Sequence, residues 1–259
     1  MVPSFCFYSK IEPLFKNESK EVPKLSKVFV IPDVHLKPWM FEQAGKIIEK
    51  NDFDKIVLLG DLVDDWNQQE NIKLYQQTLD TALDFVNQYA QRILFCIGNH
   101  DISYLWQEYE TGYSIEAGDV VRQGINKIMY ALPEGGSGFI HRVDNVLFSH
   151  AGLTQSFVIK TFGQGGLLSI DEMIALINRM GSKELWSYDS PIWARPQYGR
   201  MRLYPRDLLQ VVGHTPMPKA FHDGRLLSLD TFSTYQDGRP IGEERFVWVD
   251  TVEKKEEYC

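Results

Sequence analysis

The stretch Ile93-Leu94-Phe95-Cys96-Ile97-Gly98-Asn99-His100-Asp101 decides how this chain folds. Five apolar residues lead through a glycine into three polar residues. An unbroken apolar run rich in β-branched and aromatic residues indicates a strand buried on both faces of an α/β sheet. The polar triplet would then lie at the carboxyl end of the strand, where open α/β sheets bind their ligands. Taken alone, the triplet is equally compatible with an ordinary turn.

The segments around this strand repeat the same design. Apolar runs at 27–31 and 55–59 precede it, and helical patterns over about 40–49 and 69–91 separate the three runs. Alternating strands and helices are typical of a parallel sheet with crossover helices. Beyond the third strand, a helical spacing of aromatic residues continues over 104–113. Further strand patterns follow at closer spacing, which favours a second sheet packed on the first; they cover 146–148, 208–212, 225–229 and 245–249.

The domain organisation follows from these segments. Residues 1–26 are expected to be a lead-in, and 27–252 a single domain with a long insert at about 154–206. Residues 253–259 form a charged tail that we expect to be frayed. The glycine-rich segment 134–138 lacks the strand-then-helix context of a phosphate-binding loop, so a plain turn is expected there.

Composition narrows the functional classes. Of 259 residues, 44% are hydrophobic and 24% charged, as in ordinary globular proteins, and the net charge is -8. An acidic chain has no broad field that would attract a phosphate backbone, which argues against nucleic acid as a partner. The three widely spaced cysteines argue against a disulfide framework, and no apolar run is long enough for a membrane span. We therefore expect a cytoplasmic protein.

Chemically active side chains gather at the ends of the apolar runs. Four of the six histidines follow such a run, together with two aspartates and an asparagine: His35, His100, His150, His214, Asp33, Asp61 and Asn99. Carboxylates and imidazoles that converge at one sheet edge need a cation to offset their repulsion. Nitrogen and oxygen ligands without cysteine suit Mn, Fe, Zn or Co, and two ions about 3.5–4 Å apart would use this many ligands. His141 and His222 lie outside the pattern and are expected to be surface or structural residues.

Five short motifs make a family resemblance plain. In order and spacing they resemble the motifs of the calcineurin-like metallophosphoesterases, and they span most of the chain: Asp33-Val34-His35, Gly60-Asp61-Leu62-Val63-Asp64, Gly98-Asn99-His100-Asp101, Ser149-His150-Ala151-Gly152 and Gly213-His214-Thr215. The chain looks most like the branch with the bacterial Ser/Thr protein phosphatases and the symmetrical diadenosine tetraphosphate hydrolases. The resemblance implies an α/β fold of two mixed β-sheets packed as a sandwich, with helices on the outer faces.

The resemblance also implies a dinuclear centre of divalent ions, with manganese expected first and iron, zinc or cobalt as alternatives. By the family pattern, Asp33 and His35 bind one ion and Asp61 bridges both. The ligands implied for the second ion are Asn99, His150 and His214. A hydroxide bridging the ions would attack phosphorus in line, so that no protein nucleophile is needed.

Two further residues are given catalytic roles by the resemblance. His100 would be the general acid that protonates the leaving oxygen, and Asp64 would orient it. Asp64 could instead only cap the following helix. Asp101 is expected to be a cap without chemistry, and Asp230, which follows a later strand, is expected to be structural.

The chain departs from the family pattern around the phosphate. In the phosphatase branch an arginine follows the second motif directly, but here Asp65 occupies that position, and Leu36 replaces the glycine that usually follows the first-motif histidine. A second family arginine lies in a tryptophan-containing loop after the fourth motif. Arg195 matches it better than Arg200 or Arg202, and an arginine suits phosphate because it binds in a bidentate manner.

These patterns predict a metal-dependent phosphatase that hydrolyses phosphomonoesters, on phosphoproteins or on small phosphorylated molecules. Pro216 stands where related phosphodiesterases and nucleases have a second histidine, which favours the phosphatase-like branch. One alternative is a hydrolase of dinucleoside polyphosphates or other nucleotides. Another is a non-catalytic metal-binding interaction module, which the complete set of ligands and the presence of His100 disfavour.

Overall fold

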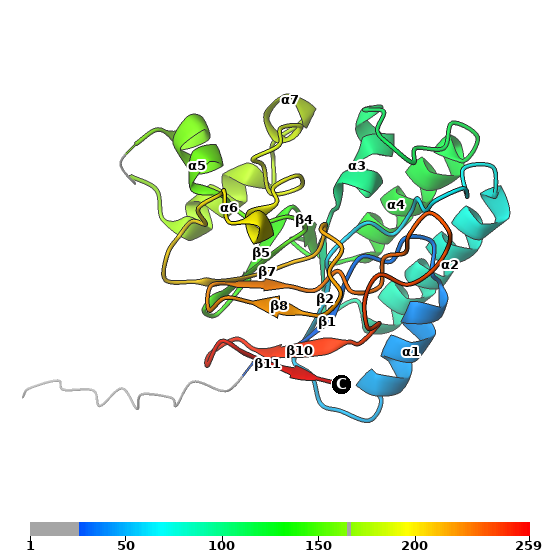
Figure 1. Cartoon of the computed structure of the whole chain (residues 1–259), viewed down its shortest axis with the longest axis horizontal. Helices are drawn as coiled ribbons and strands as arrows, with labels where there is room; N and C mark the ends of the chain where they lie inside the picture. The colour runs from blue at the N-terminus through cyan, green and yellow to red at the C-terminus, as the bar shows by residue number, and fades with distance from the viewer. Residues whose placement is uncertain (1–25, 165–166) are drawn as a thin grey trace, which may run out of the picture.

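Two mixed β-sheets form the centre of the molecule (Figure 1). The computed structural model describes residues 26–164 and 167–259, so the expected lead-in lies outside the described residues except for Ser26. The first sheet consists of β1 (Lys27–Ile31), β2 (Lys55–Leu58), β3 (Ile93–Cys96), β4 (Ser137–Gly138), β10 (Val247–Asp250) and β11 (Lys255–Tyr258). Their order is β11-β10-β1-β2-β3-β4. The pairs from β1 to β4 are parallel, as the alternating pattern predicts, and β10 and β11 pair in antiparallel fashion.

The second sheet is built from the later part of the chain. Its strands are β5 (Ile140–Val143), β6 (Val146–Ser149), β7 (Leu209–Val212), β8 (Phe221–His222) and β9 (Leu226–Ser228). Their order is β5-β6-β7-β9-β8, with β6, β7 and β9 parallel and the two outer strands antiparallel. The predicted two-sheet architecture is therefore confirmed.

Helices cover the sheets in two groups. Figure 1 shows one group at the right, next to the first sheet, and the other at the upper left. The first group is α1 (Trp39–Ile48), α2 (Ile72–Tyr89), α3 (Asn99–Trp106) and α4 (Gly118–Ala131). The second occupies the expected insert and comprises α5 (Gln155–Phe162), α6 (Ile170–Ile177), α7 (Ser182–Leu185) and the 3-10 turn η1 (Pro196–Tyr198). Within the described residues, no helix is both long and apolar enough to cross a membrane.

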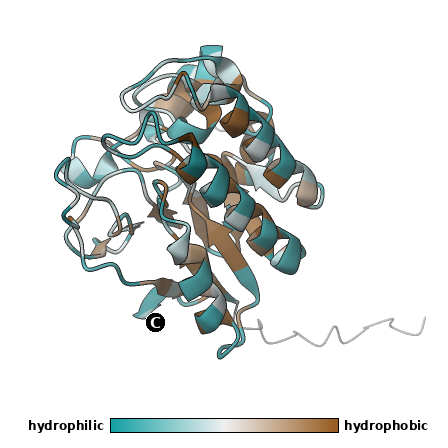
Figure 2. Cartoon of the chain, turned by 90° about the vertical axis from the view of Figure 1, so that its right-hand side faces the viewer, coloured by the Kyte–Doolittle hydropathy of each residue, from teal (hydrophilic) through white to brown (hydrophobic). Residues whose placement is uncertain are grey.

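Alternate side chains of β1 point to opposite faces of the first sheet and pack into two different hydrophobic cores. Val28 and Val30 of β1 point into the core between the sheets, whereas Phe29 and Ile31 point into the core under the helices. Because both faces of β1 are covered, its sequence is an unbroken apolar run. Figure 2 shows the result: brown strands lie behind helices that have teal outer faces.

The structure corrects several boundaries. The helical pattern over 104–113 is wrong beyond Trp106, because Gln107 adopts a left-handed conformation (φ 57°) that ends α3. The aromatic spacing arises because the following segment folds back, so that the rings of Tyr104 and Tyr113 stack at 4.1 Å. The expectation of a frayed tail is also wrong, because β11 pairs with β10. In segment 134–138, Ser137 and Gly138 form the short strand β4 and are not only a turn.

Candidate functional site

The carboxyl ends of strands from both sheets meet in one cleft. The loops after β1, β2 and β3 come from the first sheet, and those after β6 and β7 come from the second. The cleft has a volume of about 620 Å³. Among the predicted site residues, it is lined by His35, Asp61, Asp64, Asn99, His100, Arg195 and His214. All five motifs are thus brought together, although up to 181 residues separate the hydrogen-bonded pair Asp33 and His214.

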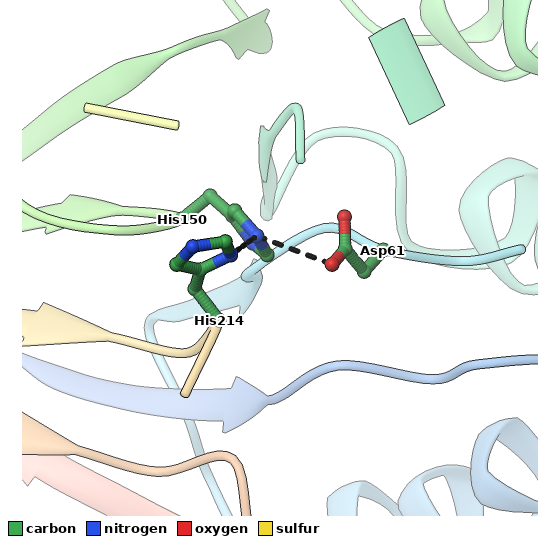
Figure 3. Close-up of side chains that lie close together, drawn as sticks. All are labelled: Asp61, His150 and His214. Atoms are coloured by element: carbon green, nitrogen blue, oxygen red, sulfur yellow. Dashed lines mark hydrogen bonds and ion pairs between the residues drawn. The ribbon is translucent and has the colours of Figure 1, made fainter. Parts of the chain in front are cut away.

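The first candidate metal group lies where the two sheets meet. Figure 3 shows Asp61, His150 and His214 pointing toward one another from different strand ends. The Nε2 atom of His150 lies 3.2 Å from Oδ2 of Asp61, 3.0 Å from Nδ1 of His214 and 2.9 Å from Oδ1 of Asn99. One ring nitrogen with at most one hydrogen therefore faces three groups that can all accept.

The partner of the other ring nitrogen of His150 shows which nitrogen faces the candidate metal site. That other nitrogen, Nδ1, lies 2.8 Å from the carbonyl oxygen of Leu59, which can only accept. Nδ1 therefore carries a proton. Burial lowers the pKa of His150, but Asp61 and Asp33 outweigh it and raise this pKa to about 9. A proton on Nε2 can bond only one of the three facing acceptors at a time, and a bound cation would take the place of that proton. A histidine held in this way by a backbone carbonyl is the usual arrangement of a metal ligand. The donor set fits a divalent cation.

A second candidate group shares Asp61 with the first. Ligand atoms of Asp33, His35 and Asp61 lie within 4.8 Å of one another. Oδ2 of Asp61 lies 3.8 Å from Nε2 of His35, and the same oxygen contacts His150, so it is the atom common to both groups. Oδ2 of Asp33 and Nε2 of His214 are buried without a hydrogen-bond partner among the described residues. This arrangement suits the bridging position that the resemblance implies for Asp61.

The electrostatics of the cluster also favour bound cations. Burial, reinforced by Asp230 and Asp61, raises the pKa of Asp33 well above its usual range. Burial, together with His150 and Arg195, lowers the pKa of His214 well below its usual value. Burial opposes ionisation of Asp61 as well, but His150 and His100 outweigh it and hold the pKa of Asp61 low. Without added positive charge, the site holds carboxylates that cannot all ionise favourably.

Two glycines without a Cβ atom let the carboxylates of Asp61 and Asp33 approach the backbone closely. A Cβ atom at Gly98 would lie 2.1 Å from Oδ1 of Asp61, and one at Gly213 would lie 1.9 Å from Oδ2 of Asp33. Asp101 supports the same turn by accepting the backbone N–H groups of Asp61, Leu62 and Gly98 at 2.8, 2.8 and 3.0 Å. It therefore caps α3, as the sequence predicts, and in addition holds the second-motif loop.

His100 and Asp64 form a buried pair at the edge of the cleft. Nδ1 of His100 lies 2.9 Å from Oδ2 of Asp64. The hydroxyls of Tyr75 and Tyr104 donate to Oδ1 of the same carboxylate at 2.7 and 2.5 Å. Asp64 is thus fixed by three donors and is not a cap of α2, whose first turn is capped by Asn71.

Arg195 lies beside the metal groups, whereas the rival arginines do not. Its Nη1 atom donates to the His214 carbonyl and to Oγ1 of Thr215, each at 3.0 Å. Among the described residues, the rest of its guanidinium makes no hydrogen bond. Arg200 and Arg202 are exposed and do not line the cleft. Of these three arginines, the structure therefore places only Arg195 at the cleft.

Asp65, at the position of the family arginine, serves a different purpose. Its carboxylate pairs with Nζ of Lys37 at 3.3 Å and accepts from Oγ1 of Thr234 at 3.1 Å. The neighbouring Trp66 donates through Nε1 to the Thr234 carbonyl at 3.0 Å. The second-motif turn is thereby joined to the segment 231–241, which forms one wall of the cleft. Trp66, Trp186 and Trp193 also line the cleft.

Two acidic residues of the cleft are not predicted as site residues. Glu110 lies in the segment after α3 and contacts both Asn99 and His100. No motif marks it, because its position depends on how the chain folds back. Asp230, expected to be structural, is buried in the cleft, with Oδ1 bound by Ser233 Oγ at 2.6 Å and Oδ2 unpartnered among the described residues. The only signal for Asp230 in the sequence is its place directly after a strand pattern.

The two histidines outside the motifs have structural contacts. His141 bonds the Phe95 carbonyl, and His222 pairs with Glu256.

The family model for calcineurin-like phosphoesterases matches residues 26–241. The chain belongs to the calcineurin-like phosphoesterase family. Membership makes it a phosphoesterase, and its Asp and His groups are suited to divalent metals. No curated protein matches the calcineurin-like chain.

A solved structure supports the fold of this calcineurin-like chain. A protein serine/threonine phosphatase from Saccharomyces cerevisiae is 14% identical and has a TM-score of 0.51, covering 87% of this chain and 73% of its own. A metallophosphoesterase from Sphaerobacter thermophilus is 13% identical, with a TM-score of 0.40 and coverages of 91% and 90%. At these identities the first structure supports the fold alone.

Proposed function

We propose that the chain is a phosphomonoesterase that depends on two divalent metal ions, with manganese as the first candidate. The observation that carries the proposal is the convergence of His150, Asp61, His214 and Asn99, whose facing atoms can all accept. Asp33, His35 and Asp61 would hold one ion, and Asp61, Asn99, His150 and His214 the other. The absence of sulfur from this set supports manganese, with iron, zinc or cobalt as alternatives. Two bound ions would lower the pKa of water and offset charge developing on the phosphoryl oxygens.

The chain's own residues would handle the leaving group and the phosphate. His100 lines the cleft and would donate a proton to the leaving oxygen, while Asp64 fixes its ring through Nδ1. Arg195 would bind a phosphoryl oxygen, because its guanidinium is anchored at one nitrogen only. Pro216 at the position of a second histidine supports a monoester, as opposed to a diester, as substrate. The substrate would be a phosphoprotein or a small phosphorylated molecule of the cytoplasm, with nucleic acid disfavoured by the acidic charge.

A hydrolase of dinucleoside polyphosphates or other nucleotides is the second candidate. The aromatic rings of Trp66, Tyr109 and Tyr235 line the cleft, and such rings can stack on bases. A non-catalytic metal-binding module is disfavoured by the intact pair of His100 and Asp64.

Turnover by the full chain with added Mn²⁺ tests the proposal. The panel is a phosphoserine peptide, p-nitrophenyl phosphate, bis(p-nitrophenyl) phosphate and diadenosine tetraphosphate. We expect hydrolysis of the monoesters, loss of activity with chelator and loss in His150→Asn. Preference for the diester, or for diadenosine tetraphosphate, would replace the monoesterase proposal. Activity that survives complete metal removal would overturn the metal-dependent reaction itself.

A further inference from the structure

The segment after α3 folds back onto the site. Gln107 ends the helix, and the backbone N–H of Glu108 bonds the Ser103 carbonyl at 3.0 Å. Gly112 has a φ of 95°, and a Cβ atom there would lie 3.5 Å from Asp64 Cβ and 3.6 Å from His100 Cε1. The fold-back therefore runs against the pair of His100 and Asp64, and it carries Glu110 to the start of α3.

The carboxylate of Glu110 contacts the side-chain amide of Asn99. Oε2 of Glu110 lies 2.7 Å from Nδ2 of Asn99. In this contact the amide donates through its NH₂ group and the carboxylate oxygen accepts. The amide oxygen then faces the other way, where Oδ1 of Asn99 lies 2.9 Å from Nε2 of His150. In the reverse orientation the NH₂ group would face the metal groups and offer no ligand.

Glu110 is buried between His100 and Asn99. Its side chain is 8% exposed, and Oε1 has no hydrogen-bond partner among the described residues. This oxygen lies 3.5 Å from Nδ1 of His100, with which it forms an ion pair. Burying a carboxylate is costly, and the contacts with His100 and Asn99 offset that cost and hold the Glu110 side chain in place.

We propose that Glu110 is a positioning residue that fixes the Asn99 amide with its oxygen toward the metal ion held by His150 and His214. The inference rests on the metal centre of the proposed function. It assigns Glu110 the part that second-layer carboxylates play for metal-binding histidines, applied here to an amide ligand. Glu110 itself does not contact the metal groups.

Measured Mn²⁺ affinity distinguishes an effect of Glu110 on the orientation of the Asn99 amide from an effect of the Glu110 charge alone. The full chain is stripped with chelator and titrated with Mn²⁺ by calorimetry, which reads binding without activity. Glu110→Ala removes the acceptor, and we expect it to weaken one Mn²⁺ site about 10–100-fold. Glu110→Gln removes the charge but still offers Asn99 an oxygen acceptor, so we expect it to retain most of the affinity. Glu108→Ala is the matched control, since the Glu108 side chain makes no hydrogen bond or ion pair within the described part of the chain.

The outcomes are distinguishable. Wild-type affinity in Glu110→Ala would overturn the inference, and so would equal losses in Glu110→Ala and Glu110→Gln, because charge alone would then explain the effect. Thermal unfolding of the metal-free variants checks that Glu110→Ala remains folded; if it does not, Glu110→Leu, which fills similar space without an acceptor, takes its place and should show the same loss of Mn²⁺ affinity. If the wild-type chain binds no Mn²⁺, the metal centre of the proposed function fails together with the inference.

Discussion

Asp64 holds His100 through a 2.9 Å contact between its Oδ2 atom and the ring Nδ1, and the hydroxyls of Tyr75 and Tyr104 fix the carboxylate from its other oxygen. Burial lowers the pKa of His100, but the carboxylates of Asp61, Asp64 and Glu110 outweigh it and hold this pKa well above the ordinary value. Nδ1 is engaged by Asp64, so Nε2 is the atom available to a leaving group. These carboxylates favour the protonated ring, which is the form that a general acid requires.

Asp64→Asn should shift the pH profile toward acid. A general acid works in its protonated form, so activity is present below the pKa of His100 and is lost as the pH rises through it. Replacing the carboxylate by an amide lowers this pKa, and the alkaline limb of kcat/KM should move to lower pH. Steady-state kinetics from pH 5 to 10 measure the shift, with the exposed Asp84→Asn as control. An unmoved limb would contradict the assignment of His100 as the acid.

His100→Asn should slow only those substrates whose leaving group needs a proton. General acid catalysis is worth about 10²–10⁴-fold, so kcat for an alkyl phosphate should fall by that order. p-Nitrophenolate leaves without protonation, and its phosphate ester should lose much less. The comparison is made at saturating Mn²⁺, with His222→Asn as the control for an exposed histidine. Equal losses for both substrates would mean that His100 does not protonate the leaving group.

Arg195→Ala should lower the catalytic efficiency of the chain toward its phosphate substrates. A charge-assisted hydrogen bond is worth about 1.5–3 kcal/mol, so we expect kcat/KM to fall roughly 10–100-fold. The fall should appear mainly as a higher KM, and inorganic phosphate should inhibit less strongly. Arg200→Ala, which alters an exposed arginine outside the cleft, should behave as wild type. If the two variants change places, Arg200 is the phosphate-binding residue.

Metal removal should destabilise the folded chain. A ligand that binds only the folded state at 100 times its Kd stabilises by about 2.7 kcal/mol. Mn²⁺ should therefore raise Tm in scanning calorimetry, and chelator should reverse the rise. His150→Asn should lose most of this response, while His222→Asn should keep it. A Tm that does not change when Mn²⁺ is added would argue against a metal-binding site in the folded chain.

Asp101→Asn should reduce stability more than an ordinary surface change. Asp101 accepts three buried backbone N–H groups, and an amide in its place presents a donor to at least one of them. Leaving buried donors unsatisfied costs about 1–3 kcal/mol each, so we expect a loss of about 2–4 kcal/mol. Urea unfolding measures it, with the exposed Asp52→Asn as control. A loss within 0.5 kcal/mol, roughly the range of ordinary surface substitutions, would contradict this role.

The strands and their ends could be predicted from sequence because the signal is local. An unbroken apolar run such as Ile93–Cys96 is buried on both faces, and the polar residues after it fall at the sheet edge whatever the loops do. Asp33 and His214 could be grouped for this reason, although they are far apart in sequence. Their roles as ligands stay predictions, and so does the acid role of His100.

Residues positioned by chain reversal could not be predicted. Glu110 reaches Asn99 only because α3 ends at Gln107, and the aromatic spacing of the same segment suggests a continuing helix. The tail is a related case, because β11 is charged and mostly exposed yet is held by backbone pairing with β10. Backbone pairing leaves little trace in the side-chain pattern on which these predictions depend.

The anchoring of Asp65 to Lys37 and Thr234 limits which residues this position can hold. An arginine in place of Asp65 would put a cation beside Lys37 and would leave Thr234 without its acceptor, so the wall formed by 231–241 would lose one of its attachments to the second-motif turn. A single substitution by arginine is thus penalised by its neighbours, and a phosphate-binding cation could be placed here only together with changes at Lys37 and Thr234.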